Sequence, residues 1–138
     1  MKKDDIAINT ATQLWHCFNE GKWDNARRLL SEEFEAYWPQ SREKIVGPDN
    51  FIELNRRYPG THKIKIQNHQ YSYDKWDHVH HVTTTVYIES KMPDGKEMTL
   101  YAVSFFEINT ENQIFSATEY WADTYDAPEW RKDLVENF

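Results

Sequence analysis

This sequence has little cysteine, little glycine and no long apolar run, and each shortage excludes a class of protein. The single cysteine among 138 residues, Cys17, cannot form an internal disulfide, so a hydrophobic core must stabilise the chain. Four glycines, with no glycine-rich loop among them, argue against a nucleotide site. No apolar run approaches the roughly 20 residues of a membrane helix, and the charged start at residues 1–5 does not resemble a signal peptide. We expect one cytoplasmic domain over residues 1–138, with no membrane partner and no cofactor.

The charge balance and the histidine pattern exclude two further kinds of partner. The sequence has 16 basic against 23 acidic residues and a net charge of −7, which repels the phosphate backbone of nucleic acids. Strand alternation would separate His81 from His78 and His80, and no cysteine or carboxylate completes a ligand set at a familiar spacing. We therefore expect neither a nucleic-acid partner nor a metal site.

Aromatic residues, by contrast, are abundant. The chain has six Trp, eight Tyr and seven Phe. Such side chains bury a large area each, and they also form good walls for pockets that take flat, apolar ligands. Most of them are expected in the core, and the remainder favours a pocket for a small apolar or aromatic molecule.

The first part of the sequence has the period and the boundary residues of helices. Apolar residues recur at helical spacing over 6–20, and Gly21 ends this segment. A second short helix is predicted over 24–30 and a third over 48–58, each bounded by capping residues, glycine or proline. Between the second and third helices, the run 34–38 reads as a short strand.

Beyond Gly60 the period changes to two, which is typical of strands. Four strands are predicted over 62–73, 78–90, 97–108 and 113–122. Polar turns separate the last three. The run Asp126 to Glu129 resembles a capping box with an early proline and predicts a short C-terminal helix that carries Trp130 and Leu134. The pattern indicates an α+β fold in which three N-terminal helices pack on a curved, mixed or antiparallel sheet.

The order and spacing of several motifs resemble those of the SnoaL-like branch of the nuclear-transport-factor-2-like superfamily, over nearly the whole chain. The motifs are Glu20 to Asp24, Ala36 to Pro39, Gly47-Pro48, Glu119 to Asp123 and Tyr125 to Arg131. The resemblance implies a cystatin-like cone whose sheet curls around a cavity, and often a homodimer through the outer face of the sheet. It implies no single activity, because the superfamily includes isomerases, epoxide hydrolases, polyketide cyclases, dehydratases and binding or assembly modules.

The resemblance also implies that the face of the last strand carrying Glu119 lines the pocket, and strand pairing extends this face across the sheet. Pairing of Ile108 with Gln113 would place Ala102 opposite Glu119. A two-residue turn at Asp94-Gly95 would then orient the strand 78–90, although a bulge would reverse that orientation. The predicted pocket residues are Leu14, Phe18, Trp38, Phe51, Tyr58, Tyr87, Ser104, Phe106, Ala117, Glu119 and Trp121, with His81 on the same side.

With this register the opposite face of the sheet is apolar as well. It would carry Val82, Val86, Ile88, Tyr101, Val103 and Phe105. A sheet that is covered on one side only should show polar residues on the other. We therefore expect a homodimer that covers the outer face.

Glu119 is the candidate for acid–base chemistry. A carboxylate among Trp38, Phe106 and Trp121 would lose its hydration, which raises its pKa toward neutrality and suits a general acid or base. The alternative is structural, with Glu119 bonded to a tyrosine or a backbone amide in the floor of the cone. If the reaction is polyketide-cyclase-like, His81 or His69 could assist.

The catalytic residues of the superfamily's known enzymes are not retained. The positions that ketosteroid isomerases use correspond here to Leu14, Trp38 and Ser104, none of which can supply the base or the strong acid. Limonene-type epoxide hydrolases have an Asp in place of Glu119 but also need an arginine in the cone, and no arginine lies between Arg57 and Arg131. Three hypotheses stay open: a small-molecule-binding module, a cofactor-independent isomerase, cyclase or dehydratase that uses Glu119, and a structural dimeric module.

Overall fold

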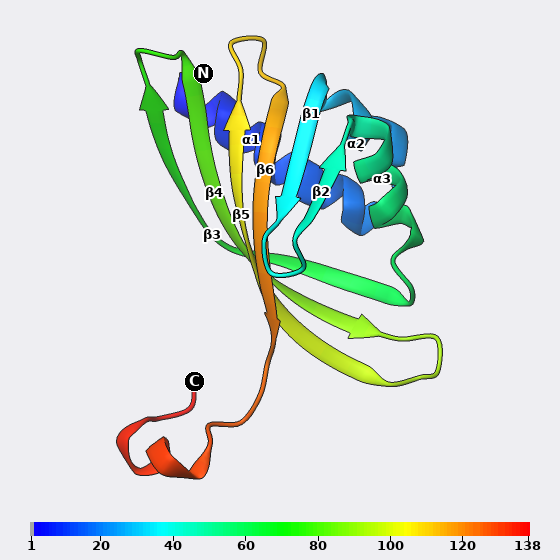
Figure 1. Ribbon diagram of the computed structural model, residues 1–138, viewed down its shortest axis with the longest axis vertical. Coiled ribbons are helices and arrows are strands. Elements are labelled where there is room, and N and C mark those ends of the chain that lie inside the picture. Colours follow the sequence, from blue (N-terminus) through cyan, green and yellow to red (C-terminus); the bar gives the residue numbers. More distant parts are fainter. Residues whose placement is uncertain (1) are drawn as a thin grey trace.

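Three helices lie on one side of a six-stranded sheet in the computed structural model, which describes residues 2–138 (Figure 1). The elements in chain order are α1 (Lys3–Glu20), α2 (Trp23–Arg28), β1 (Leu30–Trp38), β2 (Glu43–Val46), α3 (Pro48–Arg57), β3 (Thr61–Asp74), β4 (Val79–Lys91), β5 (Glu97–Ile108), β6 (Ile114–Asp123) and a 3-10 helix (Glu129–Leu134). This order confirms the α+β class, the three N-terminal helices and the short C-terminal helix. Within the described residues, no helix combines the length and the apolar character needed to cross a bilayer.

Helix α1 ends where its sequence predicts. Gly21 adopts the left-handed conformation, with φ of 68°, which glycine tolerates without a steric cost. The N–H of Lys22 then donates to the carbonyl of Cys17 and the N–H of Gly21 to that of Phe18, a pattern that closes a helix end. The apolar stripe of α1 is buried against the sheet.

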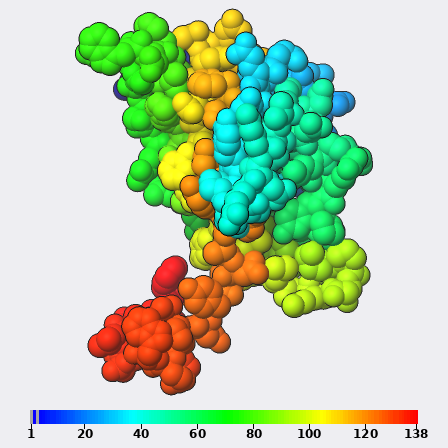
Figure 2. Space-filling model, viewed as in Figure 1, coloured from blue at the N-terminus to red at the C-terminus, as the bar shows by residue number. Residues whose placement is uncertain are grey.

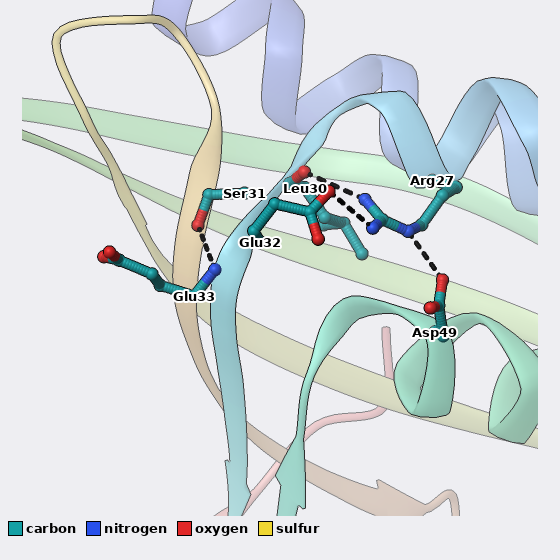
Figure 3. Close-up of polar contacts among 6 residues, drawn as sticks. All are labelled: Arg27, Leu30, Ser31, Glu32, Glu33 and Asp49. Carbon is teal, nitrogen blue, oxygen red and sulfur yellow. Dashed lines mark hydrogen bonds and ion pairs between the residues drawn. The ribbon is translucent and has the colours of Figure 1, made fainter.

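The second helix is shorter than predicted, and the first strand is longer. Helix α2 ends at Arg28, and β1 already begins at Leu30, which pairs in parallel with Ile114 of β6. Just beyond, the pairing shifts where the Ser31 hydroxyl accepts a bond from the Glu33 N–H (3.2 Å; Figure 3). Tertiary pairing therefore overrides the helical propensity of this segment.

Arg27 links helix α2 to β1 and α3 through hydrogen bonds. Its guanidinium donates to Asp49 at the start of α3 (2.7 Å), to Glu32 of β1 (2.8 Å) and to the carbonyl of Leu30 (3.4 Å) (Figure 3). Both carboxylates are largely exposed, so each pair adds little stability on its own. Their effect is to fix α2, β1 and α3 relative to one another.

The sheet is mixed, with strand order β2-β1-β6-β5-β4-β3. Strands β1 and β6 run parallel and every other neighbouring pair is antiparallel. The short strand β2 was not predicted, because its four residues, two of them charged, carry no clear alternation. Between β5 and β6 the Asn109 N–H donates to the carbonyl of Gln113 (2.9 Å), so the turn is one residue shorter than expected, and an irregularity beside Ile108 shifts the pairing by one more. Ser104 therefore lies opposite Glu119, in place of the expected Ala102. This shift of two residues leaves the side chains on their expected faces.

The predicted two-residue turn between β4 and β5 is wrong, and the error exchanges the faces of β4. The Met92 N–H donates to the carbonyl of Lys96 (2.8 Å), so the turn between them consists of three residues, 93–95. The pairing moves by one residue and places Thr84 opposite Ser104. A shift of one residue turns every side chain of a strand over. As a result, His81 and Tyr87 lie on the outer face, and Val82, Val86 and Ile88 lie on the inner face.

The chain beyond Asp123 leaves the sheet and extends away from the cone, as Figure 2 shows for the residues at the red end of the colour scale. Thr124 is the point of attachment, since its N–H donates to the carbonyl of Thr99 (3.0 Å). Farther along, Trp130 and Leu134 have about three quarters of their surface exposed, at 74% and 78%. The C-terminal segment therefore presents apolar surface to solvent.

Candidate ligand-binding cavity

A cavity of about 750 Å³ lies between the helices and the inner face of the sheet. Its apolar lining is Trp15, Phe18, Trp23, Trp38, Leu54, Pro59, Ile64, Ile88, Leu100, Ala102 and Trp121. Its polar lining is Asn50, Glu53, Asn55, Arg57, Tyr58, His62 and Glu119. Glu119 comes from β6, whereas the other polar residues come from α3, the segment after it and the start of β3. A cavity of this size with a largely apolar lining suits a small organic molecule.

Glu119 is the buried polar residue of the cavity, with 7% of its surface exposed. Two side chains from the neighbouring strands donate to its carboxyl group: Trp38 Nε1 on β1 to Oε1 (3.1 Å), and the Ser104 hydroxyl on β5 to Oε2. Burial raises the pKa of Glu119 above its ordinary value, and the bonds from Ser104 and Trp38 offset part of that effect. Among the described residues, no cationic side chain contributes to this balance, which is set by burial and by the two neutral donors.

The two partners fix where a proton would bind. The indole N–H of Trp38 can only donate, so Oε1 must stay an acceptor. The hydroxyl of Ser104 can donate or accept. When Glu119 is protonated, the proton therefore lies on Oε2, and Ser104 becomes its acceptor. The same three side chains accommodate both charge states of the carboxyl group.

Aromatic rings enclose the carboxyl group and the space in front of it. Trp38 and Trp121 meet edge to face, with centroids 4.9 Å apart. On the helical side, Trp15 is oriented by a bond from its Nε1 to the hydroxyl of Thr84 (3.0 Å). Phe18 packs on Trp15 with its centroid at 6.0 Å. These contacts hold the rings in place before any ligand binds.

A second group of polar side chains lies where α3 meets β3. The rings of Tyr58 and His62 are 4.2 Å apart. The bond to the carbonyl of Pro59 requires His62 Nε2 to donate (2.9 Å), and His62 Nδ1 contacts Ser90 Oγ (2.7 Å). Burial, and then the nearby charge of Asp123, raise the pKa of Tyr58. Tyr58 therefore keeps its phenolic proton.

The charged residues of this region pair with each other. Glu53 accepts bonds from Arg56 and from Arg57 Nε, the latter at 2.8 Å. These bonds, from Arg56 first and then Arg57, lower the pKa of Glu53 to about 2. Arg57 lines the cavity and shares the single carboxylate of Glu53 with Arg56, so these three side chains together keep a net positive charge. Among the described residues, no cationic side chain pairs with Glu119.

The structure brings some of the predicted site residues together and separates others. Phe18, Trp38, Tyr58, Glu119 and Trp121 line the cavity. Leu14, Phe51, Phe106 and Ala117 belong to the solid core, with 0–1% of their surface exposed. Ser104 is buried behind Glu119, and His81 and Tyr87 lie on the outer face because of the three-residue turn.

Sequence reasoning missed several lining residues. Ile88 was assigned to the wrong face by the error in the turn. Trp15 belongs to the predicted first helix and Trp23 immediately precedes the predicted second one, and their size among apolar neighbours could have identified them as lining residues. His62 was read as an ordinary strand residue. Within residues 2–138, no group of three His, Cys, Asp or Glu side chains is arranged to hold a metal ion.

Comparison with known proteins identifies the family and the fold. Residues 11–117 match the family model of the SnoaL-like domain. One similar structure is an NTF-2-like protein of unknown function from Burkholderia xenovorans LB400, with a TM-score of 0.76, 20% identity and coverage of 99% of this chain and 98% of that chain. Another is a candidate ketosteroid isomerase from Kribbella flavida DSM 17836, with a TM-score of 0.73, 22% identity and coverage of 100% and 93%.

A further similar structure is the orange carotenoid protein of Anabaena (Nostoc) sp. PCC 7120 binding canthaxanthin, with a TM-score of 0.65 and 17% identity. The match covers 91% of this chain and 38% of that one. At such identities the likeness concerns the fold. No curated protein sequence gives a significant match.

Proposed function

This chain belongs to the SnoaL-like family of the nuclear-transport-factor-2-like superfamily, and from that membership we propose that its cavity binds one small, largely apolar or aromatic organic molecule. The observation that carries the proposal is an aromatic-lined cavity of about 750 Å³ with one buried carboxyl group, Glu119, in its wall. Pockets for small molecules combine apolar walls with a few polar groups that orient the ligand. The canthaxanthin complex of a structural neighbour gives a precedent for an apolar ligand in this fold.

We propose binding without turnover as the primary function. Leu14, Trp38 and Ser104 stand where the isomerases of the superfamily have catalytic groups. The arginine that borders the cavity, Arg57, is already paired with Glu53. Both oxygens of Glu119 are occupied by bonds from the protein. These features favour holding a ligand over transforming it.

The alternative is a cofactor-independent isomerase, cyclase or dehydratase in which Glu119 acts as general acid or base. The raised pKa of Glu119, caused by burial, supports it, because a carboxyl group that ionises nearer neutrality transfers protons more effectively. His81 would take no part, since it lies on the outer face of β4.

Native mass spectrometry of the intact protein, purified under mild conditions, tests the binding proposal. We expect a co-purified or added aromatic molecule to appear as one extra mass per chain. Titration with neutral aromatic probes, read by tryptophan fluorescence, gives the affinity, because Trp15, Trp23, Trp38 and Trp121 line the cavity. A protein that retains no ligand and binds no probe from a broad neutral, cationic and anionic set would contradict the proposal and favour a purely structural module.

We also propose a homodimer through the outer face of the sheet. Tyr101, Phe105 and Tyr120 are 42%, 46% and 42% exposed there, and the ring of Tyr87 lies 5.0 Å from that of Tyr101. The corrected register therefore keeps an aromatic outer face, although with different members from β4. Exposed aromatic surface of this kind favours association. A single domain over 1–138 and a cytoplasmic location stay predictions.

A further inference from the structure

The ionised form of Glu119 lacks a counter-charge inside the cavity. Its carboxyl oxygens receive a bond each from Trp38 and Ser104, an arrangement that suits a carboxylate. Neither partner carries a positive charge, and no ion pair between described residues involves Glu119. A buried carboxylate that is bonded but not neutralised is costly. A ligand that brings a positive charge would remove that cost.

The surroundings of Glu119 favour the same kind of ligand. Trp38 and Trp121 are in contact with each other and line the cavity beside the carboxyl group. The faces of indole rings attract cations, more strongly where water is excluded. Across the cavity, Trp15 and Trp23 supply two further indole rings. Among the described lining residues, Arg57 is the one lysine or arginine, and its Nε donates to Glu53. The net charge of −7 favours the approach of cations.

We propose that the cavity selects organic cations, namely amines or quaternary ammonium compounds with an aromatic or branched apolar body. This inference rests on the proposed small-molecule function. The positive group lies against the carboxylate of Glu119 and the indoles of Trp38 and Trp121. The apolar body fills the space toward Phe18 and Leu54.

Selection of a cation couples binding to the protonation of Glu119. Burial raises the pKa of this carboxyl group in the empty cavity, and a bound cation lowers it again, because the opposite charge favours the ionised form. Binding therefore releases a proton at any pH where Glu119 is protonated in the free protein. The affinity for the cation rises with pH until Glu119 is ionised, and then becomes level.

Other titratable groups face the same cavity and must be separated from Glu119. Glu53 stays ionised over the working range, since its pKa is lowered to about 2 by Arg56 and Arg57. Tyr58 stays neutral, because its pKa is raised by burial. His62 also borders the cavity. The pH dependence that persists in a Glu119→Gln variant measures the contribution of all groups other than Glu119.

A matched pair of probes tests the proposal on the intact protein. Benzyltrimethylammonium and neopentylbenzene have nearly the same shape, and they differ in one atom, a charged nitrogen in place of a carbon. Calorimetry and tryptophan fluorescence at about pH 8 should give an affinity about tenfold or more higher for the cation, which is within the range of cation–π and charge interactions. The preference for the cation over the neutral probe should fall as pH is lowered. Calorimetry in two buffers of different ionisation enthalpy should detect the proton that binding releases.

Two variants locate the effect. In Glu119→Gln the preference for the cation should fall severalfold, to the part that the indole rings supply. Glu111→Gln is the control and should keep the full preference, because Glu111 is exposed in the turn between β5 and β6 and does not line the cavity. Equal or tighter binding of the neutral probe by the wild-type protein would overturn the cation proposal and leave the small-molecule function standing. A cavity that binds neither probe, nor any member of the broad set, would overturn both. The pH series on the wild-type protein keeps the test decisive should Glu119→Gln fail to fold.

Discussion

At the scale of single residues, Glu119 shows how one buried carboxyl group is positioned by its neighbours in the sheet. Ser104 lies directly opposite on β5, and Trp38 reaches it from β1. Alternation groups Glu119 with Ala117 and Trp121 on one face of β6, and the resemblance to SnoaL-like proteins indicated that this face is the inner one. Trp38 was also expected near Glu119. Ser104 was not expected directly opposite, because the shorter turn and the irregularity beside Ile108 each shift the pairing by one residue.

The first prediction concerns the pH dependence of stability. The pKa of Glu119 is raised above 4.5 by burial, so the native state binds its proton more tightly than the unfolded state does. The contribution of Glu119 to the free energy of unfolding is therefore fully present below the unfolded pKa and is lost as pH rises through the native pKa. The loss is about 1.4 kcal/mol for each pH unit over which the two states differ by one proton.

Urea unfolding of the wild-type protein and of Glu119→Gln from about pH 4 to 8 measures this effect. The free energy of unfolding of the wild type should decline relative to that of the variant as pH rises, and the difference should then become level. The comparison cancels the other titrating groups, which both proteins share. Parallel curves would show that Glu119 ionises alike in the native and unfolded states.

The second prediction concerns the hydrogen bonds that Glu119 receives. Ser104→Ala removes the larger favourable bond to its carboxylate and Trp38→Phe the smaller, so each should raise the pKa of Glu119 further, Ser104→Ala by more. Carbon-detected NMR of labelled glutamate, assigned with Glu119→Gln, follows the titration. Ser90→Ala is the matched control, since this buried serine bonds to His62. A pKa that is unchanged in both variants would refute the assigned roles.

At the scale of elements, the periods and the boundary residues predicted most of the helices and long strands. Gly21 and the glycine–proline pair before α3 marked real boundaries. The error in β4 arose because Asp94-Gly95 is compatible with both two-residue and three-residue turns, which differ by one residue in register. That single ambiguity moved Ile88 out of the predicted cavity and Tyr87 into it. Strand β2 was not predicted because its four residues are too few to show an alternation.

The third prediction tests the close packing at the junction of α3 and β3, which borders the cavity at Pro59. Gly60 has φ of 90°, and a Cβ there would lie 2.4 Å from the carbonyl oxygen of Lys91. Gly95 has nearly the same φ, 88°, with no atom within 4 Å of such a Cβ. Alanine at Gly95 should therefore cost about 1 kcal/mol, which is the backbone strain alone.

Alanine at Gly60 should cost about 1–2 kcal/mol more than alanine at Gly95, because the backbone at Lys91 must move as well. Urea unfolding of the two variants side by side gives the difference. We also expect weaker ligand binding for Gly60→Ala, since Pro59 and His62 line the cavity on either side of this position. Equal losses of stability for the two variants would show that the junction has room to adjust.

At the scale of the whole molecule, the chain buries one face of its sheet and leaves the other aromatic. The helices cover the inner face and leave the cavity between the two layers. The outer face carries aromatic side chains from β4, β5 and β6, and the C-terminal segment adds the exposed Trp130 and Leu134. The expected outer face combined residues of β4 and β5. The turn error makes its β4 members, Val82, Val86 and Ile88, wrong, whereas its β5 members, Tyr101, Val103 and Phe105, do lie on this face. A monomer would keep all this surface in water.

The fourth prediction is that a charge on the outer face dissociates the dimer. Phe105 is 46% exposed and lies 6.4 Å from Tyr120, near the middle of this face. In Phe105→Glu an unpaired carboxylate would be buried on association. The dissociation constant of the dimer should therefore rise about 100-fold or more. Light scattering coupled to size exclusion, over a dilution series, measures the mass.

The matched control is Trp76→Glu, which adds the same charge at an aromatic residue that is 83% exposed in the turn between β3 and β4. This turn lies at the tip of the sheet (Figure 1), so the control should remain dimeric. Both variants should still bind ligand, because the cavity opens on the other side of the sheet. If the wild-type protein is monomeric at micromolar concentration, or if Phe105→Glu associates as tightly as Trp76→Glu, this face is not the interface. Its aromatic rings then pack only against one another, as Tyr87 does with Tyr101.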